Sequence, residues 1–145
     1  MANENVSNII FIQRRWDVSP DDRARYDAFK AAAEAGNVDE IHRLHTIGVR
    51  QRDLDIGMST AASRNNIGLM HALRALGADN FDAAAEGAAQ RGKLEAVQLL
   101  ISWMDPTYIY ETLVKSFILA EENGHTEIAD YLNRLMMPEL NLDDN

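Results

Sequence analysis

Residues 88–100 read AAQRGKLEAVQLL, and residues 32–44 read AAEAGNVDEIHRL. Each stretch opens with an alanine pair, reaches a glycine three residues later, and continues with an acidic residue and spaced apolar residues. Residues 61–73 and 119–132 carry the same arrangement in a more disguised form. Four copies of one pattern predict a repeat architecture, in which each copy is one structural unit.

The glycine position of the pattern fixes the spacing of the copies. It is occupied by Gly36, Gly92 and Gly124, and by Asn65 in the second copy, which gives separations of 29, 27 and 32 residues. Asparagine is the best replacement for glycine where the backbone needs a left-handed conformation. We therefore expect this position to end one helix and to start a tight turn into the next.

Apolar residues after the turn recur in steps of three, which places them on one stripe of a second helix. We expect this stripe to be buried, Trp103 included. An acidic residue three positions after the turn, present in three copies, lies in the first helical turn, where the helix dipole favours it. The acids are Asp39, Glu95 and Glu127, and the stripe consists of Ile41, Leu44, Ile47, Met70, Leu73, Leu76, Val97, Leu100, Trp103, Ala129, Leu132 and Leu135.

A first helix that carries small residues precedes each turn, over residues 27–35, 57–64, 83–91 and 112–123. Each unit is then helix, tight turn, helix and connector, and no stretch alternates apolar and polar residues as a half-buried strand does. The sequence therefore predicts an all-α helical repeat solenoid of about four helix-turn-helix units. Their approximate limits are residues 20–49, 50–79, 80–105 and 106–137.

Terminal segments flank the predicted repeat domain. Ser19 and Pro20 match an N-cap followed by proline at the first helical position. Residues 1–19 are expected to form a capping segment, with a helix over the open end of the array, because a terminal repeat has no neighbour on one side. Residues 138–145 are expected to form an acidic tail.

Several of these residues resemble the ankyrin repeat family. The second helix of that family opens with Gly-His-x-Glu-Ile, and Gly124-His125-Thr126-Glu127-Ile128 has the same residues. Residues 92–100 follow the signature with Lys for His and Ala for Ile, and Gly77-Ala78-Asp79 matches its closing Gly-Ala-Asp. The resemblance covers about residues 27–137. It implies a stack that binds other proteins through its connectors and the exposed ends of its first helices.

The chain departs from that family at the start of each first helix, where the Thr-Pro-Leu-His motif is absent from every copy. Spacings of 29 and 27 residues are also shorter than the usual period of about 33. These departures predict reduced β-turn fingers. Degenerate repeats of this kind resemble those common in large DNA viruses and intracellular parasites.

Composition and charge narrow the range of partners. The chain has 145 residues, no cysteine and a formal net charge of −9. Residues 1–75 carry ten basic and ten acidic residues, whereas residues 76–145 carry four basic and thirteen acidic ones. An acidic surface repels nucleic-acid phosphates and attracts a basic partner. We expect a monomer that binds neither nucleic acid nor membrane, in the cytoplasm of its cell or, for a viral protein, of the host.

The sequence offers little for catalysis. It contains no glycine-rich phosphate loop, no Gly-x-Ser-x-Gly and no His-Glu-x-x-His. His42 and His45 are three apart on one helix, but a zinc site needs three or four ligands and no third is evident. Asp53 and Asp55 are paired carboxylates that suit acid–base chemistry, yet a solvated connector is the expected position for both. The prediction is a protein without enzymatic activity, metal or cofactor.

Recognition of another protein is the function that this architecture favours, as an adaptor or an inhibitor. One alternative is an acidic mimic of nucleic acid that blocks a basic nucleic-acid-binding protein. Self-association through an apolar end and an enzyme that uses the two aspartates are the others. The predicted protein-binding residues are Arg52, Asp53, Asp55, Arg64, Phe81, Asp82, Arg91, Tyr108, Tyr110 and Glu122.

Overall fold

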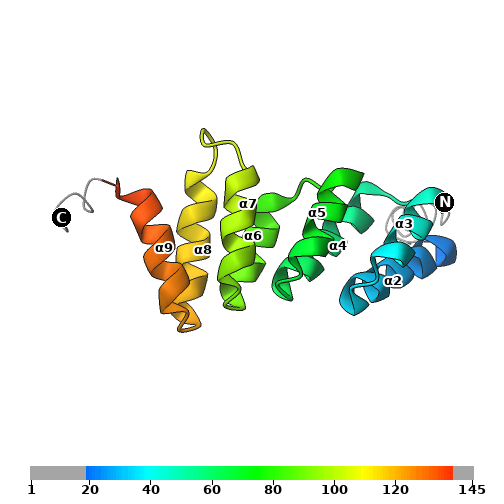
Figure 1. Cartoon of the computed structure of the whole chain (residues 1–145), viewed down its shortest axis with the longest axis horizontal. Coiled ribbons are helices and arrows are strands. Elements are labelled where there is room, and N and C mark those ends of the chain that lie inside the picture. The colour runs from blue at the N-terminus through cyan, green and yellow to red at the C-terminus, as the bar shows by residue number, and fades with distance from the viewer. Residues whose placement is uncertain (1–18, 139–145) are drawn as a thin grey trace, which may run out of the picture.

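Figure 1 shows the computed structural model of the chain, which describes residues 19–138. Within these residues every regular element is a helix, so the all-α prediction is confirmed for this part of the chain. The helices are α2 (Pro20–Ala35), α3 (Val38–Ile47), α4 (Gln51–Ser63), α5 (Ile67–Leu76), α6 (Phe81–Gln90), α7 (Leu94–Trp103), α8 (Tyr110–Glu122) and α9 (Thr126–Met136).

Consecutive helices pair into four hairpins that stand side by side in a row (Figure 1). The pairs are α2 with α3, α4 with α5, α6 with α7, and α8 with α9. The first helix of each pair packs extensively against the first helix of the next pair, whereas second helices touch one another much less. The first helices therefore form the continuous layer that holds the row together.

The predicted left-handed turn is present in all four hairpins. Gly36, Asn65, Gly92 and Gly124 have φ angles between 55° and 75°. The amide after each of these residues donates a hydrogen bond back to the carbonyl of an alanine in the preceding helix, which satisfies an end of the helix that would otherwise lack a partner. These bonds, of 2.8–2.9 Å, join Asn37 to Ala32, Asn66 to Ala61, Lys93 to Ala88 and His125 to Ala120.

The hairpin design gives the row two long edges (Figure 1). The turn edge contains the tight turns within the hairpins, at residues 36–37, 64–66, 91–93 and 123–125. The connector edge contains the segments between hairpins, at residues 48–50, 77–80 and 104–109. Successive hairpins enter and leave on the connector edge, so residues from three or four different helices meet there.

The core consists of apolar residues from both layers. Phe29 and Met58 of first helices, and Leu73 and Leu100 of second helices, are fully buried. Many core residues of the first helices are alanines, which let the helix axes approach closely; these are Ala32, Ala33, Ala61, Ala62, Ala84, Ala85, Ala88, Ala89 and Ala120.

The predicted buried stripe is wrong at two positions. Ile47 is 68% exposed and Leu135 is 42% exposed. Ile47 is the last residue of α3, and Leu135 belongs to the last described hairpin, which no described hairpin follows. Trp103 is half-buried and packs against the core, so it is less enclosed than expected.

The first helices α4, α6 and α8 begin earlier than the sequence pattern indicated, at Gln51, Phe81 and Tyr110. The predicted start of α2 is confirmed, because Pro20 is its first residue and the Ser19 hydroxyl accepts a hydrogen bond of 3.1 Å from the Asp22 amide. The expected capping helix of residues 1–19 and the tail of residues 138–145 lie almost wholly outside the described residues. No described helix has the length and apolar character needed to cross a bilayer.

Candidate functional site

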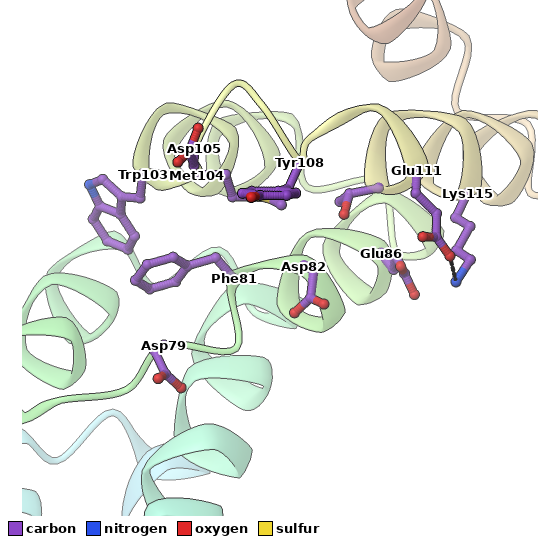
Figure 2. Close-up of a pocket in the computed structure, with 11 residues that line it drawn as sticks. Asp79, Phe81, Asp82, Glu86, Trp103, Met104, Asp105, Tyr108, Glu111 and Lys115 are labelled. Atoms are coloured by element: carbon purple, nitrogen blue, oxygen red, sulfur yellow. Dashed lines mark ion pairs between the residues drawn. The ribbon is translucent and has the colours of Figure 1, made fainter.

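A hollow of about 380 Å³ lies on the connector edge, between α6, the connector of residues 104–109 and α8 (Figure 2). We call it the connector groove. Phe81, Asp82 and Glu86 of α6 line one wall, and Tyr108, Glu111 and Lys115 line the facing wall. The remaining lining residues are Asp79, Trp103, Met104, Asp105 and Thr112.

Aromatic rings form the apolar part of the groove. Phe81 and Trp103 lie at one end with their ring centroids 5.4 Å apart (Figure 2). The guanidinium of Arg74 lies over the Trp103 ring at 4.6 Å, which is a cation–π contact. Tyr108 is different, because its side chain is 78% exposed. The aromatic pair of Phe81 and Trp103 is therefore already in contact with the Arg74 cation, whereas the ring of Tyr108 faces solvent.

Glu111 and Asp105 are groove carboxylates whose local partners lower their pKa. Glu111 pairs with Lys115 at 2.8 Å, and this hydrogen-bonded pair lowers the pKa of Glu111 and raises that of Lys115 (Figure 2). Asp105 accepts a hydrogen bond of 2.8 Å from the Thr107 amide, which lowers the pKa of its carboxyl. Both groups therefore stay ionised at neutral pH.

Asp82 and Glu86 are the groove carboxylates without such a partner. They lie one turn apart on α6, which puts them on the same face of the helix. Neither forms an ion pair with any residue between 19 and 138. Five carboxylates and a single ammonium line the hollow, so its charge is strongly negative.

The structure brings three predicted site residues together in this groove, namely Phe81, Asp82 and Tyr108. Tyr110 is the first residue of α8 and is 67% exposed. Rings that only filled the gap between two hairpins would be less exposed than Tyr108 and Tyr110 are. Both rings are available on the connector edge.

Asp53 corrects the sequence prediction. It was expected on a solvated connector, but it lies in the first turn of α4 and is 1% exposed. One carboxylate oxygen accepts a hydrogen bond of 2.9 Å from the Arg50 amide, so the side chain caps the helix. Asp55 is also helical, and its carboxylate accepts a hydrogen bond of 3.0 Å from the Gln51 side chain. Neither aspartate belongs to an open carboxylate pair.

The other predicted residues lie away from the connector groove. Arg64 and Arg91 meet on the turn edge, where they line a second hollow with Ser63 and Lys93. Arg52 lies over the Tyr26 ring at 5.7 Å near the start of the stack. Glu122 is the exposed last residue of α8, next to the turn edge. The predicted set is therefore divided among three parts of the surface.

Several residues that line the connector groove were not predicted from the sequence. Glu86 and Lys115 are charged residues in the middle of first helices, and Thr112 is 5% exposed. Of the unpredicted lining residues, only Asp105 could have been identified from the sequence, because it lies beside Tyr108 in the connector of residues 104–109. The other residues line the hollow because α6 packs against α8. The periodicity of a single helix does not show how two helices pack.

No group of three or more potential metal ligands occurs among residues 19–138, and neither His42 nor His45 finds a third ligand there. The connector groove offers negative charge and aromatic surface. No protein-family model matches the sequence, and a search of curated proteins finds no match. Statements about family and function therefore rest on the residues of this chain.

Proposed function

We propose that this chain is a divergent ankyrin-type repeat solenoid and that it works as a non-enzymatic protein-interaction module. The same left-handed turn in four successive hairpins supports a true repeat. The short connectors of residues 48–50, 77–80 and 104–109 suit an array with reduced fingers. A stack of this kind presents an extended surface and is suited to recognition.

The observation that carries the proposal is the connector groove. Isolated exposed apolar residues are ordinary, but an exposed tyrosine beside two further rings in a hollow needs an explanation. Tyrosine and tryptophan contribute heavily to binding energy at protein interfaces. Tyr108 and Tyr110 project from adjoining positions of the connector edge, and the groove extends the surface toward Trp103.

The charge of the groove indicates the partner. Asp82 and Glu86 form no close ion pair in the described part of the chain, and five carboxylates face the single ammonium of Lys115, so the groove attracts a protein with a basic surface. We propose an adaptor or inhibitor that covers such a surface inside a cell, in the host cytoplasm if the protein is viral. In this proposal the module contacts neither nucleic acid nor membrane directly.

Affinity purification from the native cell tests the proposal. The bait is the full chain, and the comparison variant is Tyr108→Ser with Tyr110→Ser. We expect a specific protein that the parent recovers and the double variant loses. The matched control is Arg43→Ser with Arg134→Ser, two exposed residues of the second helices α3 and α9, which should retain that protein. Equal recovery by all three baits would refute the assignment of the surface.

An acidic mimic of nucleic acid is the second candidate, and the acidic excess in residues 76–145 favours it. A mimic needs its carboxylates in line along one face. Here Asp82 and Glu111 lie near the connector edge, whereas Glu95 and Glu127 lie near the turn edge, which is the reason for ranking this function second. Competition between this chain and DNA or RNA for the recovered partner would reverse the ranking.

A further inference from the structure

We infer that the connector groove binds an extended segment of the partner protein through an arginine side chain. This inference rests on the proposed function and makes its partner specific. The guanidinium would lie against the Tyr108 ring and pair with Asp82 and Glu86. We call these three residues the arginine seat.

Two arginines of this chain already lie over aromatic rings of neighbouring helices. Arg52 lies over the ring of Tyr26 at 5.7 Å, and Arg74 lies over Trp103 at 4.6 Å. Tyr108 is the exposed ring of the next hairpin, and no arginine or lysine between residues 19 and 138 lies over it. A partner that supplied a guanidinium would repeat the contact that the chain makes internally at the two earlier positions.

The carboxylates give the second argument. Asp82 and Glu86 line the wall opposite Tyr108, and Figure 2 shows both side chains on the groove side of α6. Lys115 is the only cation in the lining; its ammonium pairs with Glu111 at 2.8 Å and is also attracted by Asp82 and Glu86 over a longer distance. Five carboxylates outnumber this single ammonium, so the groove keeps a net negative charge that attracts a cation from outside.

Arginine fits the seat better than lysine for geometric reasons. A planar guanidinium stacks on an aromatic ring and presents several N–H donors to carboxylates at the same time. An ammonium is a compact, strongly hydrated charge that offers neither the plane nor the fork. The hollow of about 380 Å³ accommodates a side chain with the adjoining backbone, rather than a whole folded domain.

Fluorescence anisotropy with synthetic peptides tests the inference on the full chain. The probe is a labelled, glycine-rich heptapeptide with arginine at two alternate positions. The comparison peptides carry lysine or citrulline at those positions, and citrulline keeps the shape of arginine without its charge. We expect the arginine peptide to bind several-fold more tightly than the lysine peptide, and the citrulline peptide to bind at least tenfold more weakly than the arginine peptide.

Variants locate the site. Asp82→Asn with Glu86→Gln should weaken the arginine peptide at least fivefold, and Tyr108→Ala should weaken it about two- to fivefold, as expected for an exposed cation–π contact. The matched control is Glu127→Gln with Asp130→Asn on α9, which removes the same charge and should stay within twofold. Circular dichroism of each variant checks that the helices are retained.

Three results would overturn the inference: equal affinity for the arginine and citrulline peptides, equal affinity for the arginine and lysine peptides, or equal weakening by the groove and α9 variants. Equal weakening by the groove and α9 variants would mean that the net charge of the protein, and not the groove, attracts the peptide. Failure here is distinct from failure of the proposed function. A partner that depends on Tyr108 and Tyr110, together with no arginine-peptide binding, would retain the module and reject the arginine seat.

Discussion

At the turn edge, the same backbone hydrogen bond recurs in four hairpins, with an alanine carbonyl as the acceptor each time. At the connector edge, no two connectors share a sequence, and the segment of residues 104–109 carries the groove. The turn edge therefore carries the information that builds the stack. The connectors differ from one another in sequence, and surface segments of this kind are where binding residues are commonly found.

The turn edge also joins neighbouring hairpins. The Asn65 side chain accepts a hydrogen bond of 3.0 Å from the Ala96 amide, so a turn residue of one hairpin caps α7 in the next. A ring nitrogen of His125 lies 3.0 Å from the Gln90 carbonyl of the preceding hairpin. Changes at the turn edge should therefore reduce stability, whereas changes at exposed residues of the connector groove should leave it almost unchanged.

The largest expected effect comes from Gly92→Ala, with Gly124→Ala as its matched control. Both glycines have a φ of 75°, and each substitution should cost about 1–2 kcal/mol for the left-handed backbone. A Cβ at position 92 would lie 2.7 Å from the His125 ring, whereas one at position 124 meets nothing within 4 Å. Urea denaturation should therefore show a total loss of about 2–4 kcal/mol for Gly92→Ala, because crowding adds to backbone strain. Equal losses would contradict this account.

The next effect tests Asp53, a buried residue of the connector edge that supports the fold. Asp53→Ala removes the acceptor of the Arg50 amide and should lower the free energy of unfolding by about 0.5–2 kcal/mol. Asp53→Asn keeps an oxygen that can accept this bond and should lose less. Thermal unfolding followed by circular dichroism measures both. An equal loss for asparagine and alanine would show that the charge, rather than the cap, is the important feature.

A pH-dependent effect is expected at Asp22, where α2 meets the start of α4. The Ser19 hydroxyl and the Arg50 guanidinium, at 2.8 Å, hold the pKa of Asp22 below its ordinary value. A carboxyl with a lowered folded-state pKa stabilises the fold above its unfolded pKa of about 3.9, and this contribution is lost as the pH falls through the folded value. The difference in stability between the parent and Asp22→Asn should therefore shrink below about pH 4. A difference that is constant from pH 7 to pH 3 would rule this out.

The smallest expected effect is at the groove. Tyr108→Ser should change the free energy of unfolding by less than about 0.5 kcal/mol, because an exposed side chain gives up little packing. The same urea titration that measures the turn variants provides the comparison. A loss above about 1 kcal/mol would mean that Tyr108 stabilises the stack and that the two edges are less separate than described.

Several features followed from the sequence alone because they are local. A left-handed turn requires glycine or asparagine, so Gly36, Asn65, Gly92 and Gly124 identified the four turns, and the spacing of Leu44, Leu73, Leu100 and Leu132 identified the buried face of the second helices. The all-α class follows from the same periodicity. The Ser19 cap and the exposed tyrosines of the last connector were also readable, because each depends on neighbouring residues in the chain.

Only the tertiary structure decided which residues meet. The sequence predicted a solvent-exposed Asp53 on a connector. In the structure α4 begins two residues before Asp53, and the packing of α2 against α4 buries the side chain. Asp82, Glu86 and Tyr108 come from different helices and connectors, and no sequence interval predicts that they line one hollow. The physical reason is that helix propensity and periodicity act over one or two turns, whereas a groove depends on how neighbouring hairpins stack.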